Sequence, residues 1–74
     1  MININGIDWQ VYLVSANHPQ LFRSDGSWTI GVCDSERHSI YLYEEMPERM
    51  MRRVLAHEIT HAAMFSYDIH LDIH

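Results

Sequence analysis

The chain has 74 residues, of which 47% are hydrophobic, and a formal net charge of −5 at pH 7. This length corresponds to one small domain, so we expect residues 1–74 to fold as one unit around a thin core. No apolar run approaches the roughly 20 residues of a membrane span, and no basic stripe suggests nucleic-acid binding. The first residues lack the features of a signal peptide, so we expect a cytoplasmic protein without membrane or nucleic-acid partners.

Cysteine usage narrows the ways in which such a small core can be reinforced. Cys33 is the only cysteine, which excludes an internal disulfide and a cysteine-rich zinc cluster. We interpret Cys33 as a buried strand residue rather than a nucleophile. A bound metal or a partner subunit, as in a homodimer, is the remaining source of extra stability.

The N-terminal part of the chain has the two-residue periodicity of β-strands. Asn5-Gly6 predicts a type I′ turn between a short strand, Met1–Ile4, and a longer one, Ile7–Val14. Ser15–Arg23 contains His18-Pro19, so we expect a loop there.

Two further strands are expected after this loop. Asp25-Gly26 predicts a turn, and the alternation that follows predicts a strand over Ser27–Cys33. His38–Tyr43 alternates in the same way, with Ile40 and Leu42 on one face.

From Glu48 to about Ser66 the hydrophobic period becomes helical. Pro47 suits the first helical turn, and the apolar arc contains Met50, Met51, Val54, Leu55, Ile59, Ala62 and Phe65. The sequence therefore predicts an α+β fold, in which a small antiparallel sheet of three to four strands packs against one long C-terminal helix.

The predicted helix contains the most informative motif of the chain, His57-Glu58-Ile59-Thr60-His61, which reads H-E-x-x-H. Four helical residues turn about 400° and rise about 6 Å, so both imidazoles lie on one face and can share a zinc ion. Glu58 lies about 100° round the helix, beside the ion, where a base can take a proton from zinc-bound water. This position is inside the apolar arc, where a carboxylate without a partner is costly.

Catalytic zinc usually has three protein ligands and one water, and the motif supplies only His57 and His61. The pattern H-E-x-x-H-x-x-G-x-x-H is excluded, because Met64 and Tyr67 occupy its glycine and final histidine positions. The remaining candidates are Asp68, His70, Asp72 and His74. Each of them requires the helix to end near residues 66–68 and the chain to fold back, and we favour His70. A ligand from a second chain is the alternative.

The strand Ser39–Tyr43, Met46-Pro47-Glu48 and the segment Arg53–His61 together resemble the ImmA/IrrE-like zinc metallopeptidases. The likeness is closest to the very short versions from phages and mobile elements, and it extends to the Ile7-Asp8-Trp9 strand. The resemblance implies that His57 and His61 bind zinc and that Glu58 is the general base. The family's third ligand, usually an acidic residue on a following helix, has no matching position, as in a protein truncated after the motif helix.

Two functional hypotheses follow. In the first, the protein is a zinc-dependent metallopeptidase that hydrolyses a peptide or protein substrate, which adds as an extra strand if Ser39–Tyr43 forms the sheet edge. In the second, it is a catalytically impaired phage-encoded binding protein, an inhibitor or antitoxin that reuses the peptidase-like fold. A purely structural zinc site ranks last, because it leaves Glu58 without a role.

Overall fold

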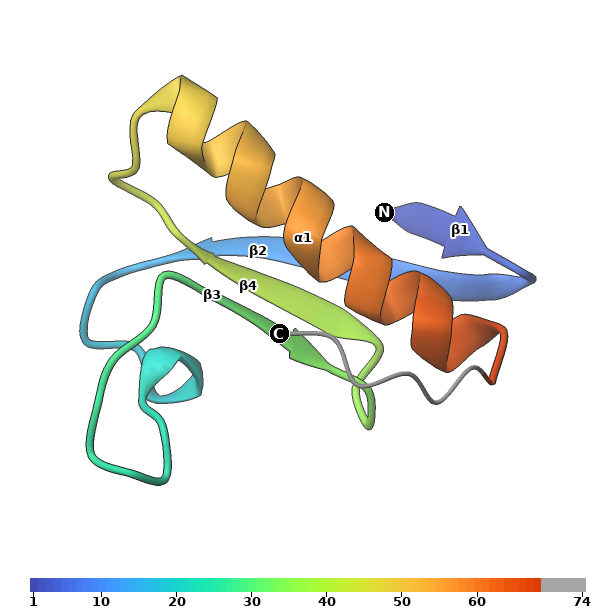
Figure 1. Cartoon of the computed structure of the whole chain (residues 1–74), viewed down its shortest axis with the longest axis horizontal. Helices are drawn as coiled ribbons and strands as arrows, with labels where there is room; N and C mark the ends of the chain where they lie inside the picture. Colours follow the sequence, from blue (N-terminus) through green and yellow to red (C-terminus); the bar gives the residue numbers. More distant parts are fainter. Residues whose placement is uncertain (69–74) are drawn as a thin grey trace.

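One four-stranded sheet carries a long helix on one face (Figure 1). The computed structural model describes residues 1–68. In the described part, the elements are β1 (Ile2–Ile4), β2 (Ile7–Val14), the 3₁₀-helix η1 (Pro19–Leu21), β3 (Gly31–Asp34), β4 (Ser39–Tyr43) and α1 (Glu48–Ser66). The predicted α+β fold class is confirmed, and so are both ends of the helix.

The sheet is mixed rather than antiparallel throughout. Its strand order is β1-β2-β4-β3, and the outer pairs β1/β2 and β3/β4 are antiparallel. The central pair β2/β4 is parallel, with Val11 opposite Ile40 and Leu13 opposite Leu42. A parallel pair needs a crossover connection, and here η1 and β3 provide it. Ser39–Tyr43 is therefore an interior strand, and β3 forms the sheet edge instead.

The first hairpin agrees with its sequence signal. Asn5 and Gly6 both have positive φ angles, 50° and 81°, as a type I′ turn requires. Ile4 pairs with Ile7, and Ile2 pairs with Trp9. The hairpin thereby places the indole of Trp9 under the C-terminal end of α1.

The strand predicted over Ser27–Cys33 forms only in its second half, since β3 begins at Gly31. Residues before it pair with the preceding loop instead. The backbone N–H of Thr29 donates to the carbonyl of Leu21, and Trp28 forms an isolated bridge with Phe22. Trp28 and Thr29 therefore pair across the turn at residues 23–27 rather than within the sheet.

The core lies between the sheet and α1. Trp9, Ile40, Leu42, Met46 and Ala62 are buried together. The indole Nε1 of Trp9 donates a 2.8 Å hydrogen bond to Oγ of Ser66, so the last residue of α1 is attached to β2.

The opposite face of the sheet is covered in part by the segment around η1. Ile40 and Leu42 face the helix, so the alternation turns Tyr41 to the other side. There the His18 ring stacks on Tyr41 with centroids 5.6 Å apart, and Leu21 is fully buried. Among residues 1–68 no helix combines the length and the hydrophobicity that crossing a membrane demands.

Candidate metal and catalytic site

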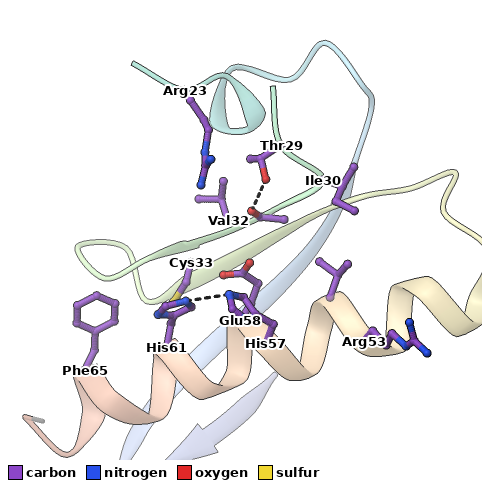
Figure 2. Close-up of a pocket in the computed structure, with 12 residues that line it drawn as sticks. Arg23, Thr29, Ile30, Val32, Cys33, Arg53, His57, Glu58, His61 and Phe65 are labelled. Carbon is purple, nitrogen blue, oxygen red and sulfur yellow. Dashed lines mark hydrogen bonds between the residues drawn. The ribbon is translucent and has the colours of Figure 1, made fainter. Parts of the chain in front are cut away.

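His57 and His61 face each other on one side of α1. Their Nε2 atoms are 3.1 Å apart, and their ring centroids are 4.7 Å apart with the planes at 77° (Figure 2). His57 is exposed and His61 is half-buried, so the two nitrogen atoms meet at the surface of the helix. As the four-residue spacing predicts, the two imidazoles lie together on one face of the helix.

The separation of the two nitrogen atoms matches what a shared metal ion requires. Two histidine nitrogens bound to one tetrahedral zinc, each at about 2.0–2.1 Å, are about 3.3 Å apart. The observed 3.1 Å, at which the two rings form a hydrogen bond with each other, is close to this value. Imidazole nitrogen is also among the ligands that zinc prefers.

Glu58 turns away from solvent toward the sheet. Its side chain is only 8% exposed and packs against Gly31 of β3. A β-carbon at residue 31 would be 3.1 Å from Oε2 of Glu58. Helix and edge strand can therefore approach each other only because this residue is glycine.

The environment of Glu58 makes its carboxylate a stronger base than usual. Burial raises the pKa of Glu58 above its ordinary value, and the nearby His57, His61 and Arg23 oppose the shift without cancelling it. A carboxylate with a raised pKa accepts a proton more readily near neutral pH. The side chain that the sequence predicts to lie beside a metal is thus suited to general-base chemistry.

These side chains open into a pocket of about 520 Å³ between α1 and the β3 edge (Figure 2). One wall belongs to α1, with Val54, His57, Glu58, His61 and Phe65. The other wall belongs to β3 and the loop before it, with Arg23, Thr29, Ile30, Val32 and Cys33. The volume is within the roughly 300–1,000 Å³ of typical ligand sites.

Cys33 lines this pocket but is poorly suited to nucleophilic chemistry. Burial, together with the negative charges of Glu58 and Asp34, raises its pKa to about 12. At neutral pH the sulfur is therefore a thiol, and the thiolate is the reactive form. Cys33 is half-buried, in line with its interpretation as a strand residue.

The described residues do not identify a third metal ligand. No group of three or more His, Cys, Asp or Glu side chains within residues 1–68 is arranged to hold a metal. The helix does end at Ser66, and Asp68 follows with a φ of 54°. His70, Asp72 and His74 lie outside the described residues, so the prediction for His70 stays a prediction.

Sequence reasoning missed three residues that shape the pocket, namely Arg23, Gly31 and Cys33. Gly31 carried a usable signal, because a glycine within a strand pattern often marks a close approach of another segment. Arg23 carried none, since its place depends on how the loop folds over the edge of β3.

No protein-family model, curated protein or solved structure matches this chain. The resemblance to ImmA/IrrE-like metallopeptidases therefore stays an expectation based on the sequence motifs. What the site can do follows from His57, Glu58 and His61 themselves.

Proposed function

We propose that this protein is a zinc-dependent metallopeptidase-like hydrolase, with zinc held by His57 and His61 and Glu58 as the general base. One observation carries the proposal: two Nε2 atoms lie 3.1 Å apart beside a buried carboxylate whose pKa is raised. When bound, zinc would lower the pKa of its water to about 7 and polarise a substrate carbonyl.

The role of Glu58 follows from its place between the histidines and β3. Its carboxylate accepts a proton from the attacking water and passes that proton to the leaving amine. Packing against Gly31 restricts the side chain to this position. A fixed base needs no reorganisation at the moment of reaction.

The substrate would bind along β3. In the described sheet β3 has β4 on one side only, and its residues line the pocket beside the histidines. An extended peptide can add to such an edge through main-chain hydrogen bonds. His70, or a residue of a second chain, would complete the coordination of the metal.

The experiment separates metal binding from hydrolysis. Wild type, Glu58→Gln and the control Glu44→Gln, which changes an exposed glutamate, are measured for zinc content and for cleavage of a peptide library. We expect Glu58→Gln to retain zinc and to lose at least about 100-fold in hydrolysis, while Glu44→Gln keeps both. Wild type without zinc, or Glu58→Gln with full hydrolysis, would contradict the proposal.

A second candidate function is a binding protein, such as a phage-encoded inhibitor or antitoxin. It is favoured by the lack of a three-residue metal group within residues 1–68. Exposed aromatic residues add support, since Phe22 and Trp28 are 50% and 54% exposed and large aromatic side chains are common at interfaces. This function predicts a complex that survives chelator and the His57→Ala, His61→Ala double substitution.

A further inference from the structure

We propose that Arg23 and Arg53 make the pocket selective for peptides that carry a carboxylate side chain, Asp or Glu, next to the site. As a statement about the substrate, this rests on the proposed peptidase function. As a statement about binding, it does not depend on zinc, because both arginines belong to the protein itself.

The charge distribution singles out this pocket. The chain has ten acidic and five basic residues. Within residues 1–68 two arginines form ion pairs, Arg37 with Asp34 at 2.9 Å and Arg52 with Glu48 at 2.6 Å. Arg23 and Arg53 take part in neither pair, and both line the pocket. Two of the five basic residues thus line one pocket of an otherwise acidic protein, whereas Arg49, which is also in neither ion pair, does not line it. Their positive charge favours an acidic occupant there.

The backbone of Arg23 is held in place by its loop. Its backbone N–H donates to the carbonyl of Ser27 at 2.7 Å, and its own carbonyl accepts from Gly26 at 3.0 Å. The neighbouring rings of Phe22 and Trp28 are in edge contact, with centroids 5.0 Å apart. From this turn the guanidinium reaches down toward the pocket above Glu58 (Figure 2).

Two acidic groups, Asp25 and Glu58, are near enough to Arg23 for its charge to lower their pKa values, but neither is among the ion pairs of residues 1–68. Asp25 is in the same turn, but its carboxylate accepts hydrogen bonds from the N–H and hydroxyl of Ser27, at 2.9 and 2.6 Å. Glu58 is the one acidic residue that lines the pocket, and it is buried against Gly31. The guanidinium groups of Arg23 and Arg53 can therefore form ion pairs with a ligand.

The expected preference is modest because both arginines are exposed. Exposed ion pairs contribute about 0.2–1 kcal/mol, which corresponds to about a 1.4- to 5-fold difference in affinity. Salt screens such pairs over about 10 Å at 0.1 M. The preference should therefore be largest at low ionic strength.

The test uses the full chain without metal, so that no cleavage occurs. Two blocked alanine-based nonapeptides, with Glu or Gln at the centre, are titrated while backbone amide shifts are followed by NMR. The variants are Arg23→Gln, Arg53→Gln, the charge-conserving Arg23→Lys, and Arg49→Gln as a matched control, because Arg49 is an exposed α1 arginine that does not line the pocket.

We expect wild type, Arg23→Lys and Arg49→Gln to bind the Glu peptide more tightly by about 2- to 5-fold, with shifts around the pocket. Arg23→Gln and Arg53→Gln should each reduce this preference. Equal affinities in wild type, failure of both peptides to bind, or full preference in Arg23→Gln would overturn the inference. Tighter binding of a single-stranded oligothymidylate than of the Glu peptide would overturn it as well.

Failure of this inference can be distinguished from failure of the proposed peptidase function. If the protein prefers the Glu peptide but binds no zinc, the acidic-peptide selectivity is supported and the peptidase function is contradicted. If the protein binds zinc and cleaves peptides without this preference, the peptidase function is supported and the selectivity of the pocket is contradicted.

Discussion

Glu58 of α1 lies directly over Gly31 of β3. A β-carbon on Gly31 would stand 3.1 Å from Oε2 of Glu58 and 2.5 Å from Cγ1 of Val54. The missing side chain at position 31 therefore sets how closely the helix approaches the sheet edge. Because His57 and His61 belong to the same helix, this one contact also sets how far the histidines stand from the edge strand.

Gly31→Ala is expected to destabilise the fold by about 1–3 kcal/mol, the usual cost of overpacking. The new methyl group has no space unless Val54 and Glu58 move. Urea denaturation measures the free energy of unfolding, and NMR of the imidazole protons detects displacement of the histidines.

Val54→Ala provides the control for that substitution, because it removes the side chain closest to the added methyl. The Gly31→Ala, Val54→Ala double variant should lose less unfolding free energy than the sum of the losses in the two single variants. Full additivity would mean that the helix and the edge strand are not in the close contact described above.

Ser66→Ala tests the attachment of the helix end to the first hairpin. The substitution leaves the buried Nε1–H of Trp9 without its acceptor, which costs about 1–3 kcal/mol. Thr60→Ala is the matched control, since it removes a hydroxyl that bonds to the Ala56 carbonyl on the exposed face of the same helix. The control should change stability by less than about 0.5 kcal/mol. Similar losses in both variants, by thermal or urea unfolding, would argue against a special role for the Trp9–Ser66 bond.

Glu58→Gln is expected to change how the stability of the metal-free protein depends on pH. Burial raises the pKa of Glu58 in the folded protein above the ordinary 4.5, so the folded state binds its proton more tightly than the unfolded state. The contribution of protonated Glu58 to the stability of the folded state is fully present below pH 4.5, and it is lost as the pH rises through the folded-state pKa. Glu58→Gln cannot ionise at this position. Its stability relative to wild type should therefore be greater at pH 7 than at pH 4.

Urea denaturation at several pH values, in the presence of chelator, measures this difference. Glu44→Gln is the control and should follow wild type at every pH, because Glu44 is exposed. If the stability difference between Glu58→Gln and wild type were the same at pH 4 and pH 7, Glu58 would not have the raised pKa on which its role as base depends.

The parts of the fold that depend on local sequence were predictable. The turn at Asn5-Gly6 needs positive φ at both residues, and these residue types tolerate it. The helix Glu48–Ser66 has a proline at its start and a continuous apolar arc. The H-E-x-x-H spacing alone is enough to bring the two imidazoles together.

The parts that depend on contacts between distant segments were not predictable. The parallel pairing of β2 and β4 follows from a crossover whose route the local pattern does not encode. Trp28 and Ile30 continue the strand alternation, yet the backbone of Trp28 and Thr29 pairs with Phe22 and Leu21. The same loop closure places Arg23 at the pocket, so its role could emerge only from the structure.

The most direct test of the central claim is a calorimetric titration of zinc into the metal-free full-length chain. We expect one zinc per chain in wild type, and no comparable binding in the His57→Ala, His61→Ala double variant. His38→Asn is the control: His38 has a φ of 47°, which asparagine tolerates, and it does not line the pocket. This control should bind like wild type. If wild type takes up no zinc, or if the double variant binds it equally well, the two histidines do not form a metal site.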